Sequence, residues 1–223
     1  MSVRALSLLE GRVLGVLIEK AHTVPDSYPL SLNSLTLGCN QKTARDPVLA
    51  ATDAEVQSAI DALKRVSLLF EASGSRVTRY EHNAGRVLAL PSQSVALLAT
   101  LLLRGPQTAS ELRANCERLH RFADLSSVEA FLDELAQRPD EKGGALVAKL
   151  ARAAGARESR WAQLLTGAVD AAALADASAP EDFVATSELA ALKAAQAAMQ
   201  GELADLRARV EHLYAELGVA NRD

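Results

Sequence analysis

The side chains of this 223-residue chain that are best suited by type and spacing to do chemistry are arginines that precede an aromatic residue. The pattern Arg-x-x-Arg-aromatic occurs twice, as Arg76, Arg79 and Tyr80 and again as Arg157, Arg160 and Trp161. A guanidinium stays charged throughout the physiological pH range, and its fork of N–H donors matches two oxygens of a phosphate group. The pattern therefore predicts contact with the phosphates of a nucleic acid.

Both arginine patterns lie in stretches that are expected to form β-hairpins. With Ser73-Gly74 and Ala154-Gly155 as turns, the predicted strands span residues 67–72 and 75–80 in the first hairpin and 146–153 and 156–165 in the second. Side chains alternate between the two faces of a strand. Arg79 and Arg160 should therefore face outwards, while the aromatic residues that follow them pack on the core.

Two-residue turns also fix which residues face each other across the hairpins. Glu71 is then opposite Arg76, whereas Arg152 is opposite Arg157, a like-charge pair that is costly unless an anion joins it. Lys149 adds another cation and makes the second hairpin the more basic one. We interpret the hairpins as phosphate-contacting elements; the alternative is an ordinary solvated hairpin with an Arg76–Glu71 pair.

The connector Asn40-Gln41-Lys42-Thr43-Ala44-Arg45-Asp46-Pro47 is a second candidate for phosphate contact, because it is polar and carries two cations. Lys42 and Arg45 thus complete the predicted nucleic-acid-binding set. The alternative is a structural loop whose polar side chains hydrogen-bond to the backbone.

Residues suited to catalysis or metal binding form no complete set. Cys116 and His120 lie four apart on one predicted helix, but a third and fourth metal ligand are missing nearby. His22, His82 and His212 have no partnering pattern that suggests nucleophilic catalysis, and no glycine-rich phosphate loop follows a strand. We therefore expect no catalytic residues, no metal and no cofactor, and a protein that is not an enzyme.

Helices must position each hairpin, and the sequence predicts three before each one. Before the first hairpin they span about residues 6–20, 31–39 and 52–66; before the second they span about 92–104 and 108–119, with a third from Ser126 or Ser127 to just before Pro139. Thr52 with Glu55 and Thr108 with Glu111 form capping boxes that begin two of these helices.

The repeated order of three helices and a basic hairpin is typical of a winged helix. The sequence therefore predicts an α+β fold, mainly α, with a first winged-helix domain over residues 1–88 and a second over 89–168. The third helix of each unit is acidic, however, with the carboxylates Asp53, Glu55 and Asp61 in the first and Glu129, Asp133 and Glu134 in the second. Because a helix that reads the major groove needs Arg, Lys, Asn or Gln on its exposed face, base-specific recognition is disfavoured.

The C-terminal third contains a linker and a predicted coiled-coil helix. Residues 169–182 are rich in Ala, Asp and Ser, and residues 183–218 carry a heptad pattern. The oligomerisation residues of this pattern are Leu189, Leu192, Gln196, Met199, Leu203, Leu206, Val210, Leu213 and Leu217. The pattern predicts a parallel homodimer; the alternative is a helix that folds back on its own chain.

Composition places the protein among soluble cytoplasmic chains. The formal charge is −4, but residues 171–223 carry 4 basic and 9 acidic side chains, so the acidic excess belongs to the tail. Only two cysteines are present, which suits a reducing compartment. The N-terminal apolar run is interrupted by charges, and the longest charge-free apolar stretch, 95–103, is about half of what a membrane span needs. We expect no membrane association.

Several segments between residues 5 and 166 resemble the YceH family of bacterial proteins. They are Leu9-Glu10-Gly11-Arg12-Val13, Glu19-Lys20, Tyr28-Pro29-Leu30-Ser31, Cys39-Asn40-Gln41-Lys42-Thr43-Ala44-Arg45-Asp46-Pro47-Val48 and Thr100-Leu101-Leu102-Leu103-Arg104-Gly105. The resemblance implies tandem winged helices followed by a variable C-terminal helix, and it implies no reaction. The turn Ser73-Gly74-Ser75 has less glycine than the family's usual form.

Two functional hypotheses follow. The first is a dimeric regulator that binds DNA weakly through the phosphate contacts of its hairpins. The second is a protein-interaction scaffold that docks an unknown protein partner and makes no DNA contact; the acidic helices and the near-neutral body favour it. The first is preferred by analogy, because DNA binding is the commonest use of the fold.

Overall fold

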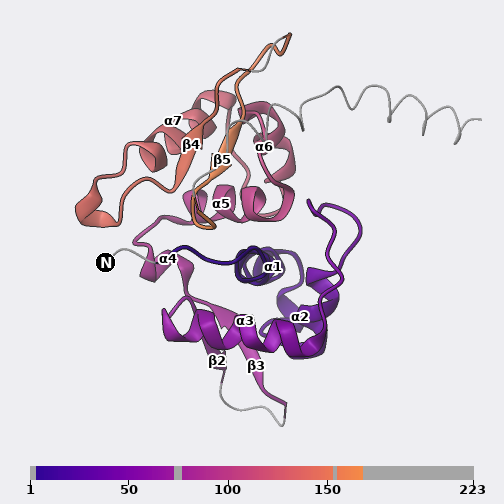
Figure 1. The fold of residues 1–223 in the computed structure, drawn as a ribbon. Helices are drawn as coiled ribbons and strands as arrows, with labels where there is room; N and C mark the ends of the chain where they lie inside the picture. The colour runs from indigo at the N-terminus through magenta and orange to yellow at the C-terminus, as the bar shows by residue number, and fades with distance from the viewer. Residues whose placement is uncertain (1–3, 73–76, 153–154, 168–223) are drawn as a thin grey trace, which may run out of the picture. The chain divides into compact units, whose positions relative to one another are not determined.

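The computed structural model describes residues 4–72, 77–152 and 155–167. Residues 1–171 form one compact unit, a mixed α+β fold in which helices dominate and the strands form small antiparallel sheets (Figure 1). The predicted linker, the predicted coiled-coil helix and its nine heptad residues lie outside the described residues. None of the described helices is long and apolar enough to cross a membrane.

The first half of the compact unit (residues 4–88) contains α1 (Leu8–Thr23), the 3₁₀ turn η1 (Pro25–Ser27), β1 (Leu30–Ser31), α2 (Leu32–Cys39), α3 (Asp53–Arg65), β2 (Leu69–Ala72), β3 (Arg79–His82) and α4 (Ala84–Val87). The second half (residues 89–167) contains α5 (Ser92–Arg104), α6 (Ala109–Asn115), α7 (Leu125–Ala136), the 3₁₀ turn η2 (Asp140–Lys142), β4 (Val147–Lys149) and β5 (Trp161–Gln163). The predicted three helices per half are present, whereas β1 and α4 were not predicted.

Helix starts follow the capping residues that the sequence offers. Thr52 and Glu55 form the predicted reciprocal capping box of α3, as Thr108 and Glu111 do for α6. Ser31 caps α2, with its side chain accepting a hydrogen bond from the Ser34 backbone N–H. Such local hydrogen bonds satisfy the free N–H groups of a first helical turn, which is why sequence alone locates them well.

The sheet of the first half has three strands and that of the second half has two, and the register of both differs from the prediction. The first sheet has the order β1-β3-β2, with Leu30 paired to Tyr80 and Glu71 also paired to Tyr80. In the second, Lys149 pairs with Trp161, which a two-residue turn at 154–155 would not allow. The predicted two-residue turns are therefore wrong. Both loops are longer, so the paired strands are shorter than predicted, and Glu71 does not face Arg76.

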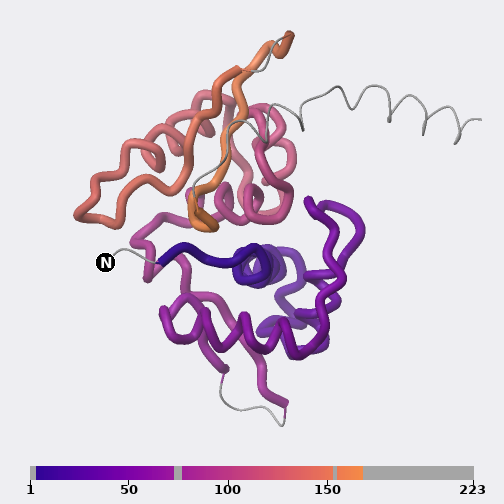
Figure 2. The backbone as a smooth tube through the Cα atoms, viewed as in Figure 1, coloured from indigo at the N-terminus to yellow at the C-terminus, as the bar shows by residue number. Residues whose placement is uncertain are grey.

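Helix α1 lies between the two halves and is buried on all sides. Every residue from Glu10 to Ile18 is buried, because α2 and α3 pack on one side of the helix and α5 packs on the other (Figure 2). The buried apolar residues of both halves form one continuous core.

Glycines allow the neighbouring helices to approach α1 closely. A Cβ at Gly15 would lie 3.0 Å from Leu103 of α5, and one at Gly11 would lie 3.0 Å from Leu102. On the opposite side, a Cβ at Gly38 of α2 would lie 2.6 Å from Val16. The helix backbones therefore pack more tightly than side chains on both partners would permit.

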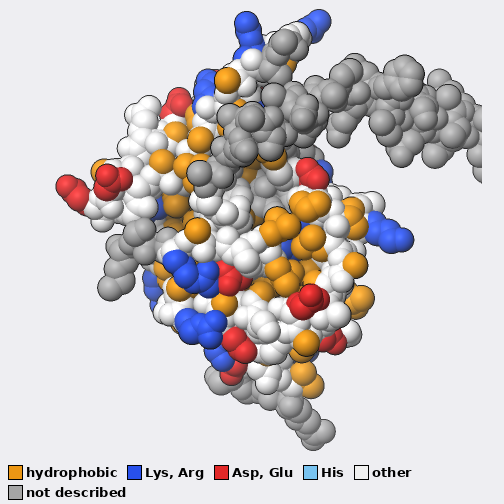
Figure 3. Space-filling model, viewed as in Figure 1, with side chains coloured by type: hydrophobic (Ala, Val, Ile, Leu, Met, Phe, Trp, Pro, Cys, Tyr) orange, Lys and Arg blue, Asp and Glu red, His pale blue; other side chains and the backbone are white. Residues whose placement is uncertain are grey.

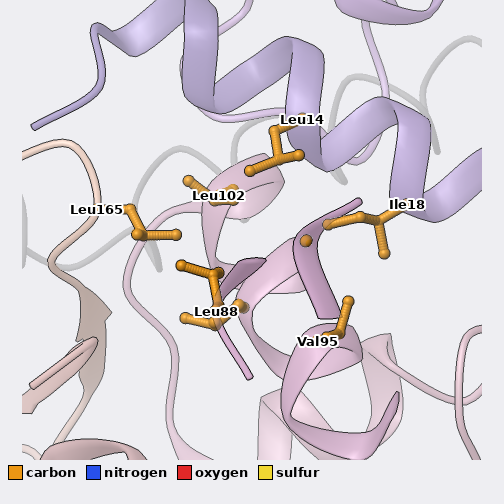
Figure 4. Close-up of a pocket in the computed structure, with 8 residues that line it drawn as sticks. Leu14, Ile18, Leu88, Val95, Leu102 and Leu165 are labelled. Atoms are coloured by element: carbon orange, nitrogen blue, oxygen red, sulfur yellow. The ribbon is translucent and has the colours of Figure 1, made fainter. Parts of the chain in front are cut away.

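The seam between the halves is dry and apolar. Leu14 and Ile18 of α1 meet Leu88, Val95, Leu102 and Leu165, and their side chains point towards one another (Figure 4). The gap that they leave has no room for a water molecule, so it belongs to the core. Two backbone hydrogen bonds also join the halves. Leu6 N–H donates to the Leu165 carbonyl (2.7 Å), and Asp46 N–H donates to the Leu103 carbonyl (2.8 Å).

We expect Gly38→Ala to destabilise the protein by about 1–2 kcal/mol, although alanine favours a helix over glycine by up to about 1 kcal/mol. The reason is the clash with Val16, whose β-branched side chain is fully buried and cannot turn away. Urea unfolding measures the change. Gly85→Ala is the control, because its Cβ would meet nothing closer than 3.4 Å; a Gly38→Ala protein as stable as this control would contradict the packing described.

Candidate nucleic-acid interface

The second hairpin carries the exposed cations that the sequence predicted. Lys149, at the end of β4, is exposed and places its Nζ 5.3 Å from the centre of the buried Trp161 ring. Arg152 and Arg157 are exposed further out, and neither makes an ion pair or hydrogen bond with another described residue. Figure 3 shows Lys and Arg side chains at the end of this hairpin, which Figure 1 draws in orange beyond the helices.

Arg79 and Arg160 lie at equivalent positions in the two hairpins, each directly before the buried aromatic residue. Each donates hydrogen bonds to backbone carbonyls of the segment before the second helix of its half. Arg79 Nη1 donates to the Pro29 carbonyl (2.7 Å) and to the Ser27 carbonyl (3.2 Å). Arg160 Nη1 donates to the Pro106 carbonyl (3.1 Å). The two prolines precede the strand residues that pair with Tyr80 and Trp161. Each arginine therefore joins the last strand of its hairpin to the segment that leads into α2 or α6.

These contacts reduce what the two arginines can offer to a phosphate. Arg79 is only partly exposed and is fixed by two carbonyls. Arg160 is half exposed, but its Nη2 lies 3.7 Å from Glu111, which balances its charge. The predicted burial of Tyr80 and Trp161 is confirmed, at 4% and 2% exposure. Arg76 lies outside the described residues, and Glu71 forms its ion pair with Lys64.

The polar connector after α2 is held by its own side chains. Asn40 donates to the Ala51 carbonyl (2.7 Å) and accepts from the Ala51 N–H (2.8 Å), so one amide clamps both ends of the loop. Gln41 donates to the Thr43 carbonyl (3.1 Å). Lys42 is exposed. Asn40 and Gln41 therefore act as the alternative predicted, as polar side chains that hydrogen-bond to the backbone of a structural loop. Lys42 remains accessible to an anion.

Arg45 is buried in an ion pair with Glu19 of α1. Its side chain has no exposed surface, and Nη1 and Nη2 lie 3.2 and 2.6 Å from the two carboxylate oxygens of Glu19. Its Nε also donates to the Gly38 carbonyl (3.1 Å) in the last turn of α2. Burial raises the pKa of Glu19, but hydrogen bonds and charge from Arg45, with help from Lys20, outweigh it and leave the pKa below its usual value.

Arg12 of α1 is a second buried guanidinium beside Arg45. It is fully buried and donates to the Cys39 carbonyl (3.1 Å) and the Pro47 carbonyl (2.6 Å). Burial lowers the pKa of Arg12, and the nearby charge of Arg45 lowers it further. Together the two arginines bind carbonyls at the end of α2, where a helix leaves its acceptors unpaired and cations are favoured.

The exposed faces of the third helices are acidic, as the sequence predicted. On α3 and α7 the exposed carboxylates are Asp53, Glu55, Asp61, Glu129, Asp133 and Glu134. Phosphates brought close to these faces would be repelled. The faces therefore do not add to a cationic surface.

Cys116 and His120, the two candidate metal ligands, have other environments in the structure. Cys116 is fully buried, and burial raises the pKa of its thiol to about 11, so it stays protonated. His120 packs edge-on against Phe122. Within the described ranges, no group of three His, Cys, Asp or Glu side chains is placed to hold a metal ion.

Comparison with known protein families shows a match over most of the chain. Residues 6–156, which include the buried arginines and β4 but end before β5, match the family described as "Protein of unknown function, DUF480". The chain belongs to the DUF480 family. This confirms the resemblance to an uncharacterised, YceH-like bacterial family that the sequence segments indicated.

Close relatives extend the likeness over nearly the whole chain. A UPF0502 protein of Paraburkholderia xenovorans is 62% identical over 218 residues, which cover 98% of this chain and 91% of the relative. A UPF0502 protein of Burkholderia pseudomallei K96243 is also 62% identical, with 98% and 92% covered. A UPF0502 protein of Methylibium petroleiphilum gives the same 62% over 219 residues.

We expect Glu19→Gln to cost about 3 kcal/mol at neutral pH, because it leaves the Arg45 charge buried without its partner. The folded-state pKa of Glu19 lies below its unfolded value of about 4.3. The contribution of the ion pair is therefore complete above that value and is lost as the pH falls through the folded pKa.

Urea unfolding at several pH values tests this expectation. The stability difference between wild type and Glu19→Gln should be constant from about pH 7 to pH 5 and shrink below about pH 4. Glu117→Gln is the matched control, since Glu117 is exposed and has no described partner; its effect should stay within about 0.5 kcal/mol. A Glu19→Gln effect that did not change with pH would show that the ion pair does not carry it.

Proposed function

We propose that this protein is a tandem winged-helix protein that binds the phosphate backbone of double-stranded DNA through its second hairpin, and that it acts by binding rather than catalysis. The order of elements supports the first part. Helix, strand, two helices and a hairpin follow one another as α1-β1-α2-α3-β2-β3, and β1 pairs with β3 at the edge of the sheet.

The second half supports the tandem arrangement by repeating this order. Helices α5, α6 and α7 precede the β4-β5 hairpin. Gln107, between α5 and α6, pairs with Trp161 by two backbone hydrogen bonds of 3.0 and 2.6 Å, as Leu30 pairs with Tyr80. Arg79 and Arg160 hold equivalent carbonyls.

The observation that carries the DNA proposal is the exposure of Lys149, Arg152 and Arg157 on one hairpin that extends from the helices (Figure 3). Three phosphate contacts give weak binding that depends strongly on salt. The acidic faces of α3 and α7 argue against base reading, so the proposed interaction has little sequence preference.

A homodimer strengthens this proposal, because it would present two such hairpins. The heptad pattern over residues 183–218 supports it, with Leu192, Met199, Leu206 and Leu213 at the d positions and a single polar a residue, Gln196. Two linked hairpins raise the overall affinity for one DNA duplex without any new contact.

A protein-interaction scaffold is the second candidate. Two features favour it: the acidic exposed faces of α3 and α7, and Leu37 of α2, which is 66% exposed. Acidic helix faces and an exposed apolar side chain suit a partner whose surface offers both basic and apolar groups.

The double variant Arg152→Gln/Arg157→Gln should weaken binding to a ~30-bp DNA duplex and reduce the slope of log K against log salt by about 2 for each chain that contacts the DNA. Fluorescence anisotropy from about 50 mM to 200 mM salt measures both quantities. Arg86→Gln is the control, because Arg86 lies on α4 and away from the hairpin sequence. An unchanged slope in the double variant, or no binding by the wild type at low salt, would favour the scaffold.

Sedimentation equilibrium tests the dimer. The full chain should sediment as a dimer, and Leu192→Asp/Leu206→Asp should sediment as a monomer, because the variant buries charges at two d positions. Far-UV circular dichroism shows that the compact unit stays folded. A wild type that is monomeric at micromolar concentration would mean that the helix does not pair between chains.

A further inference from the structure

A polar cavity lies where the two halves of the compact unit meet, away from the second hairpin. Its volume is about 270 Å³. Its walls are the C-terminal ends of α1 and α5, the connector 40–47, and the segment from Asn115, the last residue of α6, to Leu119. These elements gather beside α1 in Figure 1, and we call this space the polar cavity.

Cations outnumber anions in the polar cavity. Lys20, Arg104 and Arg118 line it, and Glu19 is the one acidic residue among the described lining residues. The Glu19 carboxylate is already bound at both oxygens by the buried Arg45, and Lys20 Nζ lies 3.4 Å from one of them. The lining residues therefore carry a net positive charge, because the Glu19 carboxylate does not balance all three cations.

Two of the cations have no partner in the described part of the chain. The side chain of neither Arg104 nor Arg118 makes an ion pair or a hydrogen bond with another described residue. Each guanidinium brings five N–H donors in a planar fork that fits phosphate oxygens. Thr43 and Asn115 add neutral polar groups, and the Asn115 amide is oriented by a 2.6 Å hydrogen bond to Gln107.

Helix polarity alone does not explain this set of cations. Lys20 and Arg104 lie in the last turns of α1 and α5, where a basic side chain complements the helix dipole. Arg118, however, follows the end of α6 at Asn115 and lies in no helix. Its position is therefore not that of a basic residue in a last helical turn, and its guanidinium can meet an anion at the cavity.

We propose that the polar cavity binds a small phosphorylated anion. Its size is near the lower end of the range for small-molecule sites, about 300–1,000 Å³, so it suits a phosphate monoester or diphosphate of modest size. Leu103 and Leu119 give the cavity an apolar wall for the organic part of such a molecule. Arg104 and Arg118 bind the phosphate oxygens.

The sequence segments that carry the family resemblance meet at this cavity. Glu19 and Lys20, the connector from Gln41, and Thr100 to Arg104 are far apart in the chain, yet all contribute lining residues. The site is independent of the DNA proposal, because no residue of the β4-β5 hairpin lines it.

Isothermal titration of the full-length protein with pyrophosphate and with inorganic phosphate, at constant ionic strength set by chloride, tests the proposal. Wild type should bind pyrophosphate, and its melting temperature should rise with pyrophosphate concentration. Arg104→Gln and Arg118→Gln should each weaken binding about tenfold or more, because each removes a charge-assisted hydrogen bond. Arg121→Gln is the matched control: an exposed arginine three residues beyond Arg118 that does not line the cavity.

Because Arg118 is exposed, Arg118→Gln should melt at the wild-type temperature without ligand, which separates a binding defect from a folding defect. Equal loss of binding in Arg121→Gln would show general attraction to anions and overturn the proposal. The absence of any pyrophosphate binding would overturn it as well. Reduced DNA affinity in Arg104→Gln and Arg118→Gln, with pyrophosphate binding unchanged, would assign these arginines to the DNA surface instead.

Discussion

The position of α1 between the two halves is the constraint on which the rest of the compact unit depends. A helix that is buried on every side contributes apolar surface to two sets of partners, so neither half has a complete core without it. Gly11 and Gly15 let α5 approach on one side, and Gly38 lets α2 approach on the other. The two halves are therefore joined through a shared helix into one compact unit with one core.

The polar interior near α1 has a different role from the apolar seam. Burying the charges of Arg12 and Arg45 is costly, and a buried ion pair such as Arg45–Glu19 often adds little net stability. Their hydrogen bonds reach carbonyls of Gly38, Cys39 and Pro47, so they determine the path of the chain after α2. That path places the connector against the end of α5, where Asp46 N–H binds the Leu103 carbonyl. The shape of the polar cavity follows from these contacts.

Sequence predicted the features that depend on local interactions. The helices and capping boxes follow from side chains within a few residues of one another, as Thr52 and Glu55 illustrate. The hairpin registers were wrong because loop length, which Gly74 and Gly155 do not specify, decides them. The repeat of Arg79 and Arg160 was found, but their partners were not, because the carbonyls of Pro29 and Pro106 lie 50 and 54 residues away in the chain.

Burial of charge was also beyond the reach of sequence. Arg12 occupies a position in the helix that an exposed arginine could equally fill, and the carbonyls of Cys39 and Pro47 that enclose it lie 27 and 35 residues away in the chain. Glu19 and Arg45 are 26 residues apart, and no periodicity links them. One signal was present: both residues fall in segments that carry the family resemblance, which a structural role in burial explains as well as a functional one.

The hydrogen bond from Leu6 to Leu165 has a consequence for how the chain folds as it is synthesised. Ribosomes release the N-terminal end first, so α1 emerges long before α5 and β5 can cover its second side. Until α5 has left the exit tunnel, the glycine-lined side of α1 lacks its helical partner, and the nascent chain carries an exposed apolar surface. Completion of the core, which includes Leu165, therefore comes near the end of translation of the compact unit.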